Sequence, residues 1–412
     1  MESQLFDLAL SINKLIGSGT PVSERKRLAI EMFERGNSKG VVEILNEKDI
    51  AADAAQARKE IEQGKLLVDS GRSLIEAGLQ KTRSLAEEYV LRVKALMTDY
   101  AEPRRFELAC HAYEQGIELV RANLSEEELA KSLFEYGCFL QANKRYDLAE
   151  VRYRENLDIY QRLAAISPQV YEPDLAMVQN NLGTLYEDTR RYGESEEMFL
   201  SVMEIRRRLV AANPQVYEPD LAGIQNNLGI LYKDTQRYED SEKMYLSAME
   251  IYRRLAAVNP QVYEPDLAMA QSNLGTLYKD TRRYEDSEKL CLSAMEIRRR
   301  LAAANPQVYE PYLVRACNNL SFLFLAQGNF EEAERYAREG AKYDSTHHTI
   351  YTNLAASLLL QGRYAEAEEI YLRYKEELKE DFLSDFEDFY QRGIIPPERE
   401  DDVERIKKLL SK

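Results

Sequence analysis

The residues best suited to chemistry are five asparagines that recur at one position of a repeated segment, each directly before a leucine. They are Asn181, Asn227, Asn273, Asn319 and Asn353. A carboxamide offers both a hydrogen-bond donor and an acceptor, so it matches a backbone peptide group in either direction. Asparagine is also a poor residue for the middle of a helix, so five copies need a compensating interaction. A row of such amides can bond an extended peptide, and we call these five residues the asparagine ladder.

A structural role is the alternative for the ladder. Each amide could instead bond a neighbouring helix or loop and set how the repeats stack, and near-identical repeats could have copied one ancestral asparagine passively. Asn180, Asn226 and Asn318 precede three of the ladder residues, while Ser272 and Thr352 precede the other two. We include Asn180 and Asn226 in the predicted peptide-binding set, because grooved or buried amides need partners.

Charged residues accompany the ladder. Lys233 and Lys279 follow two ladder residues by about one and a half turns, and each is followed by an aspartate. We expect these lysines to lie along the same surface and to favour a ligand with spaced charges, the alternative being a solvated helix end. Arginines cluster at 206–208, 253–254 and 298–300. Cations suit helix C-termini, and glutamates four residues earlier can pair with them, so we interpret most of these arginines as structural and the remainder as a surface for an acidic partner.

No motif for catalysis, metal binding or cofactor binding emerges. Ile16–Pro21 reads IGSGTP, which lacks the Gly-Lys-Ser/Thr ending of a phosphate loop. The three histidines lack the spacing of a closed zinc site, and no nucleophile elbow is present. The many carboxylates are expected on solvated helix faces. We therefore predict a chain that is not an enzyme and binds no cofactor.

The elements that position the ladder are repeated helix pairs. The hexapeptide PQVYEP occurs four times at an interval of 46 residues, starting at Pro168, Pro214, Pro260 and Pro306. Apolar residues at three- and four-residue steps predict a first helix over 175–189 and a second over 192–213. We expect PQVYEP to be a connector in which Pro168 ends one helix and Pro173 lies in the first turn of the next.

These units resemble tetratricopeptide repeats, and their length and NNLGxLY wording are similar to the elongated repeats of kinesin light chains and their bacterial relatives. The first clear unit matches at Leu182, Gly183, Tyr186, Tyr192, Phe199 and Val202. Serines 195, 241 and 287 replace the usual small alanine, and the usual early tryptophan is missing. The resemblance covers about 85–375. It implies an all-α, right-handed solenoid of antiparallel helix pairs whose ladder position faces a concave groove, and in peptide-binding members an asparagine there bonds the ligand backbone.

The predicted organisation has six parts. They are an N-terminal helical hairpin (1–48), a long helix (49–84), degenerate repeats (85–166), three near-identical repeats (167–305), two further repeats (306–380) and a C-terminal cap (381–412). Gly64, Gly71 and Gly78 recur every seven residues in the long helix. We interpret them as close packing within the chain, with a self-association seam or a hinge as alternatives.

Composition and charge limit the classes of partner that the chain is expected to bind. The formal net charge of −16 disfavours non-specific binding to nucleic acid or anionic lipid, and no apolar stretch is long enough to span a membrane. Four scattered cysteines indicate small buried residues in a reducing cytoplasm. The sequence therefore predicts a cytoplasmic scaffold or adaptor for a protein or peptide. The alternatives are a regulatory sensor whose curvature responds to a ligand and a homo-oligomeric structural element joined through the N-terminal helix.

Overall fold

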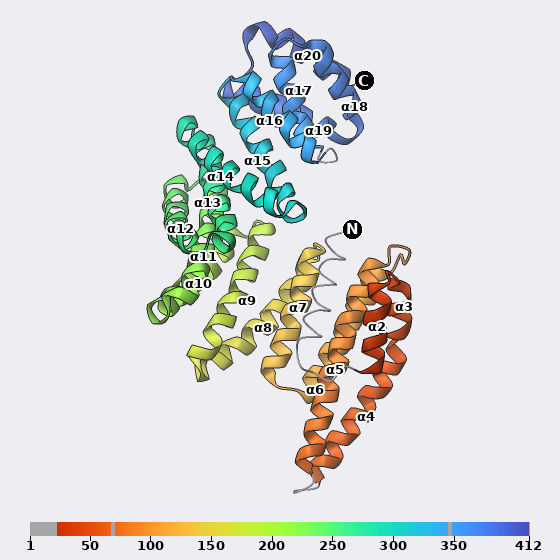
Figure 1. Cartoon of the computed structure of the whole chain (residues 1–412). Coiled ribbons are helices and arrows are strands. Elements are labelled where there is room, and N and C mark those ends of the chain that lie inside the picture. The colour runs from red at the N-terminus through yellow and green to blue at the C-terminus, as the bar shows by residue number, and fades with distance from the viewer. Residues whose placement is uncertain (1–22, 67–70, 345–347, 412) are drawn as a thin grey trace. The chain divides into compact units, whose positions relative to one another are not determined.

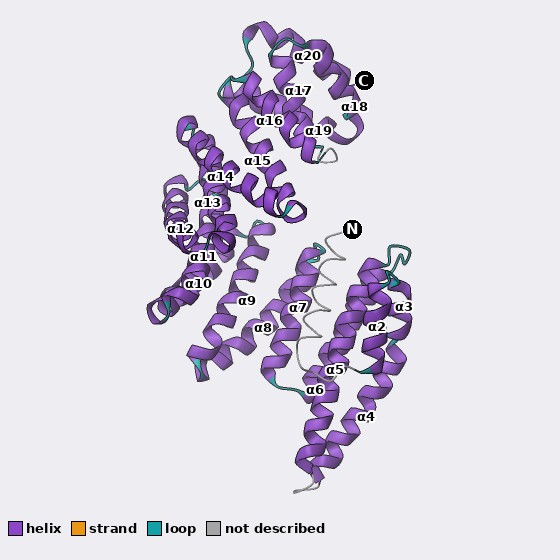
Figure 2. Cartoon of the chain, viewed as in Figure 1, coloured by secondary structure: helices purple, strands orange, loops and turns teal. Residues whose placement is uncertain are grey.

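The structure, a computed structural model, describes residues 23–66, 71–344 and 348–411, and the regular elements in these ranges are helices (Figure 2). The chain divides into two compact units, of which the first ends at Thr189 and the second begins at Arg190. The first unit contains α2 (Glu24–Glu34), α3 (Ser38–Ile44), α4 (Glu47–Leu66), α5 (Gly71–Thr98), α6 (Arg105–Asn123), α7 (Glu126–Ala142), α8 (Tyr146–Ile166) and α9 (Pro168–Asp188) (Figure 1). The all-α prediction is confirmed.

The second unit continues the same pattern of stacked helices. It contains α10 (Tyr192–Ala212), α11 (Pro214–Asp234), α12 (Tyr238–Val258), α13 (Pro260–Asp280), α14 (Tyr284–Ala304), α15 (Pro306–Ala326), α16 (Phe330–Tyr343), α17 (Ile350–Leu360), α18 (Tyr364–Arg373), α19 (Lys375–Arg392), the short 3-10 helix η1 (Pro397–Arg399) and α20 (Glu400–Ser411). Successive helices from α10 to α18 pack against one another, as a stack of helix pairs requires. None of the described helices combines the length and apolar character needed to cross a membrane.

Helices of equal length produce the 46-residue period. Helices α11 and α12 each have 21 residues. A turn over 235–237 joins them, and Asn259 alone separates α12 from α13. The turn is tight because Gln236 adopts a left-handed conformation with φ of 60°, as does Arg282 with φ of 62° in the next repeat. In the shorter repeats that follow, Gly328 and Gly362 occupy this place.

The prediction that PQVYEP is a connector is wrong. The hexapeptide forms the first turns of a helix, because Pro168 is the first residue of α9 and Pro173 lies inside it. Proline fits the first helical position, where its missing N–H has no partner to lose. The N–H of Tyr171 already bonds the carbonyl of Ser167 at 3.1 Å, so the helix is established before Pro173. The bond lost at Pro173 would have used the carbonyl of Gln169, an exposed residue in the first turn.

The prediction of one long helix over 49–84 is also wrong. Helix α4 ends at Leu66, and α5 begins at Gly71 and packs back along it as an antiparallel hairpin (Figure 1). Gly78 explains the close approach, because a Cβ there would lie 2.7 Å from Cγ1 of Ile61 in α4. This contact favours packing within the chain for one glycine of the stripe. The segment Ile16–Pro21 and the first half of the predicted N-terminal hairpin lie outside the described residues.

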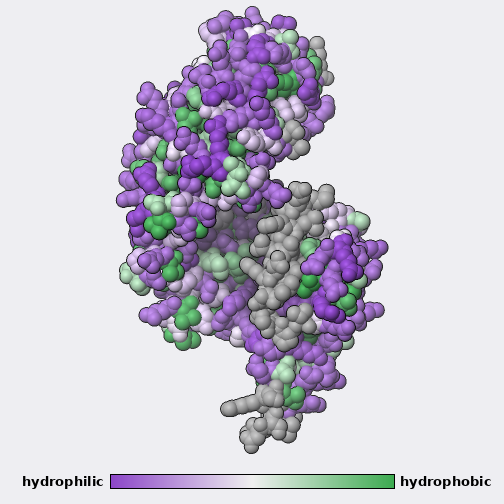
Figure 3. Space-filling model, viewed as in Figure 1, coloured by the Kyte–Doolittle hydropathy of each residue, from purple (hydrophilic) through white to green (hydrophobic). Residues whose placement is uncertain are grey.

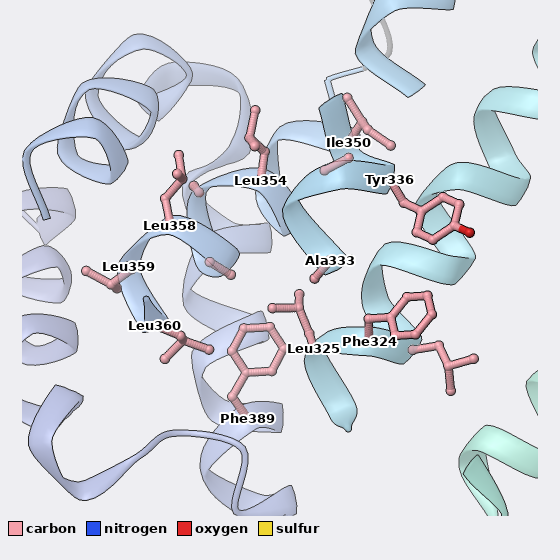
Figure 4. Packing of buried hydrophobic residues seen from close by; sticks show 14 of the residues in the cluster. Phe324, Leu325, Ala333, Tyr336, Ile350, Leu354, Leu358, Leu359, Leu360 and Phe389 are labelled. Atoms are coloured by element: carbon pink, nitrogen blue, oxygen red, sulfur yellow. The ribbon is translucent and has the colours of Figure 1, made fainter. Parts of the chain in front are cut away.

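The C-terminal end of the second unit is closed by apolar side chains. Helix α17 is buried along its length except at Tyr351, which is half-buried. The rings of Phe324 and Tyr336 stack with centroids 5.5 Å apart, and Phe389 of α19 joins the same cluster (Figure 4). Helix α19 buries Phe382, Phe386 and Phe389 against the last repeats, so the stack does not end on an exposed apolar face.

Candidate peptide-binding face

Close contacts between paired helices fix the orientation of the ladder. A Cβ on Gly229 of α11 would lie 2.6 Å from the ring of Tyr245 in α12, so only glycine allows this approach. The hydroxyl of Ser241 donates a hydrogen bond of 2.7 Å to the carbonyl of Gly229. Ser287 and Gly275 repeat this bond at the same length. Ser241 and Ser287, two of the serines that replace the usual alanine, therefore tie the second helix of their pair to the first, whereas the buried hydroxyl of Ser195 has no such bond.

Ladder residues lie at the margin of the packed face. Leu228 and Gly229 are buried against α12, so the preceding Asn227 is turned toward the edge of the helix and is half-buried. Asn273 is half-buried in the same way on α13, and Asn319 is exposed on α15. Helix α11 contacts α13, and α13 contacts α15. We call the surface of α11, α13 and α15 that carries Asn227, Asn273 and Asn319 the ladder face.

Some ladder residues also take part in stacking. The amide of Asn273 donates a 2.9 Å hydrogen bond to Oδ1 of Asn226 in the preceding repeat. Asn353 donates to Oδ1 of Asn318 at 2.8 Å and to its carbonyl at 3.1 Å. Asn353 and Asn226 are each only 2% exposed. For the pairs Asn273–Asn226 and Asn353–Asn318, these bonds are the ones expected if the ladder sets how the repeats stack.

Capacity for a ligand remains on the ladder face. The bond of Asn273 uses one of its two amide protons, which leaves the second proton and the carbonyl oxygen for another partner. Asn319 faces solvent. In the first unit, half-buried Asn181 donates to Sγ of Cys138 at 3.4 Å, and Asn180 is half-buried beside it.

The two predicted lysines are each paired with the next residue. Nζ of Lys233 lies 3.2 Å from Asp234, and Nζ of Lys279 lies 3.6 Å from Asp280. Lys279 also lies over the ring of Phe322, 4.4 Å from its centroid. Burial lowers the pKa of Lys279, and the nearby positive charge of Arg392 lowers it further. This lysine is therefore a desolvated cation against an aromatic ring rather than a fully solvated one.

Most clustered arginines pair within the chain. Arg208 pairs with Glu204 one turn earlier at 3.2 Å. Arg254 and Arg300 instead reach glutamates of PQVYEP, Glu218 at 2.9 Å and Glu264 at 2.6 Å. These contacts join the end of the second helix to the start of the first, which gives the hexapeptide glutamate a role that the sequence did not reveal.

One residue of the C-terminal helices, Asp385, was not predicted from the sequence. Asp385 of α19 meets Thr352 of α17, much as Asn353 meets Asn318 one repeat earlier. Burial raises the pKa of Asp385 to about 6, with Asp381 and Asp388 adding to the rise and the hydrogen bond from Thr352 opposing it. The cap diverges from the repeat pattern, so no sequence signal marked this position.

The described residues contain no group of three histidine, cysteine, aspartate or glutamate side chains placed to hold a metal ion. All four cysteines are free thiols, of which Cys291 and Cys317 are buried and Cys110 and Cys138 half-buried. Burial raises the pKa of each thiol. Raised values keep these thiols protonated and weakly nucleophilic.

Comparisons with known proteins agree with this architecture. One family model described as tetratricopeptide repeat matches residues 175–214, 221–259 and 267–305, and a second with the same description matches 323–381. The first three of these ranges begin at the eighth residue of α9, α11 and α13, which is after the hexapeptide PQVYEP of each helix. No curated protein sequence matches the chain.

Solved structures resemble the chain at low sequence identity. The apo form of RapI has a TM-score of 0.54 at 16% identity, covering 88% of this chain and 97% of RapI. BtubC (BKLC) from P. vanneervenii has a TM-score of 0.46 at 20% identity, covering 61% of this chain and 92% of BtubC. PilF from Pseudomonas aeruginosa has a TM-score of 0.42 at 14% identity, covering 62% of this chain and 93% of PilF. At such identities the RapI match supports the fold alone.

Proposed function

Because this chain is a tetratricopeptide repeat protein, we propose that it is a non-catalytic scaffold whose second unit holds an extended segment of a partner protein along the ladder face. Repeat proteins of this kind are interaction scaffolds in general, since stacked repeats present a long regular surface. The segment lies across α11, α13 and α15 and meets one amide in each repeat. Asn227, Asn273 and Asn319 are the contacts.

Two observations carry this proposal, the exposure of Asn319 and the hydrogen-bonding capacity that Asn273 keeps. Asn319 is exposed on α15, and Asn273 keeps one proton and its oxygen after bonding Asn226. An extended peptide offers one N–H and one C=O per residue, which such amides can bond in either direction. Asn353 and Asn226 are buried and act in stacking instead. Much of the described surface seen in Figure 3 is hydrophilic, with hydrophobic residues in separate spots, which suits polar recognition.

The experiment is affinity purification from native lysate followed by mass spectrometry. A groove variant changes Asn227, Asn273 and Asn319 to alanine. A matched loop variant changes three exposed asparagines at the same spacing, which end the second helices: Asn213, Asn259 and Asn305. Circular dichroism first establishes that both variants are as helical as the wild type. A partner retained by the loop variant and lost by the groove variant is the expected result, whereas a partner retained by both would make the ladder purely structural.

A further inference from the structure

One repeat position changes its charge along the second unit. Arg206 of α10 pairs with Asp220 of α11 at 2.9 Å, and the arginine side chain is only 11% exposed. One period later the same two places hold Tyr252 and Asp266, and two periods later they hold Arg298 and Tyr312. The last copy therefore keeps the arginine and has a tyrosine where its aspartate would be.

Arg298 is a desolvated cation that lacks an acid. Its Nη2 lies 3.5 Å from the carbonyl of Ala268, and the side chain is half-buried between α13 and α15. The charge that acts most strongly on it is another cation, Arg315 of α15. Burial, and after it the charge of Arg315, lowers the pKa of Arg298 to about 10. Within the described ranges, no carboxylate pairs with either guanidinium, although a partly buried charge is stabilised chiefly by such a pair.

These two arginines border the ladder face. Tyr312, Arg315 and Asn319 follow one another at steps of three and four residues, which places them on one side of α15, and all three are exposed. The places that Arg315 occupies in the two preceding repeats hold Gly223 and Met269. A second cation has therefore entered beside Arg298, at a place that is uncharged in the two preceding repeats.

We propose that Arg298 and Arg315 bind the carboxylate of an acidic side chain in the partner segment, one turn of α15 before the amide of Asn319. This inference rests on the proposed function and names the class of partner, an extended segment with an aspartate or glutamate at this station. The guanidinium group presents parallel donors that match the two oxygens of a carboxylate. Two repeats earlier, the arginine at the place of Arg298 pairs with the carboxylate of Asp220, so a carboxylate is the partner that this arginine position takes within the chain.

The test uses twelve-residue peptides selected from a random library for binding to the full chain. Each acidic residue of a selected peptide is changed to its amide, and Kd is measured by fluorescence anisotropy against wild type and against Arg298→Gln. One acid-to-amide change should raise Kd about tenfold with wild type and less than twofold with Arg298→Gln. Tyr312→Asp should weaken binding equally, because it leaves both arginines in place but supplies the carboxylate from within the chain.

Controls separate this site from the proposed function. Arg300→Gln removes a cation from the same helix that is already paired with Glu264, so it should bind as wild type does. Arg298→Gln should keep or raise the midpoint of thermal unfolding, since it removes a desolvated charge. Peptides that need Asn227, Asn273 and Asn319 but no acidic residue would overturn the arginine site and leave the proposed function standing. Peptides that need neither set, or a library that yields no binder, would overturn both.

Discussion

Changing Asp385 to asparagine should stabilise the C-terminal repeats at neutral pH. Burial raises the pKa of this carboxyl from its ordinary 3.8 to about 6. The folded chain therefore holds the proton more tightly than the unfolded chain does. The free energy of unfolding should fall as pH rises from about 4 to about 6 and stay low above that range. The shift corresponds to about 3 kcal/mol at pH 7.5 as an upper figure, of which about 1.4 kcal/mol develops between pH 5 and pH 7.5.

Asparagine suits the position of Asp385 because, in preceding repeats, the equivalent residue is an asparagine whose amide bonds the repeat before it. Asn353 donates to Asn318 where Asp385 meets Thr352, so Asp385→Asn keeps the shape and removes the charge. We expect a gain of about 1–3 kcal/mol at pH 7.5 and a smaller gain at pH 5. Urea unfolding followed by circular dichroism at both pH values measures the gain. Hydrogen exchange in α17 and α19 assigns it to the C-terminal end, since a repeat array can open from its ends.

A neighbouring aspartate provides the control for this prediction. Asp381 lies one turn earlier on α19 and is exposed, so Asp381→Asn should change stability by less than about 0.5 kcal/mol. An Asp385→Asn variant that is no more stable than wild type at pH 7.5, with an unchanged pH dependence, would refute the claim that this carboxylate is desolvated against the last repeats.

Two further predictions concern the repeat itself. Gly229→Ala should destabilise the chain by about 1–3 kcal/mol, because the new Cβ would overlap the ring of Tyr245, whereas Gly223→Ala in the same helix meets nothing closer than 3.6 Å and should gain about 0.5–1 kcal/mol. Equal effects of the two substitutions in thermal unfolding would contradict the packing argument. Gln236→Gly should stabilise the turn by up to about 1 kcal/mol by relieving a left-handed conformation, while Gln236→Ala should not. A Gln236→Ala variant as stable as Gln236→Gly in urea unfolding would show that the backbone is not strained there.

The repeated sequence predicted most of the helices, because apolar residues at three- and four-residue steps repeat with each unit. Their starts were misplaced because proline fits both the end of one helix and the first position of the next, and only the bond from Tyr171 to Ser167 distinguishes these. The hairpin of α4 and α5 was missed because glycine is compatible with both a helix interior and a close helix contact.

The candidate site was only partly predictable for a related reason. The spacing of the asparagines placed Asn273 and Asn319 on one surface. The sequence did not show which amides bond the preceding repeat, because such a bond joins residues that are far apart in the sequence, as Asn273 and Asn226 are. Arg298 looked like its neighbours at a helix end. Its isolation becomes visible only when Tyr312 is seen to stand where Asp220 stands two repeats earlier.

The central claim is that the ladder face of the second unit binds an extended peptide, and one affinity measurement tests it most directly. A selected or partner-derived peptide is titrated calorimetrically into wild type, the groove variant (Asn227, Asn273 and Asn319 to alanine) and the loop variant (Asn213, Asn259 and Asn305 to alanine). Three lost hydrogen bonds of about 0.5–1.5 kcal/mol each predict that the groove variant binds at least about tenfold more weakly, with the loop variant unchanged. Equal affinity for all three proteins would contradict the account.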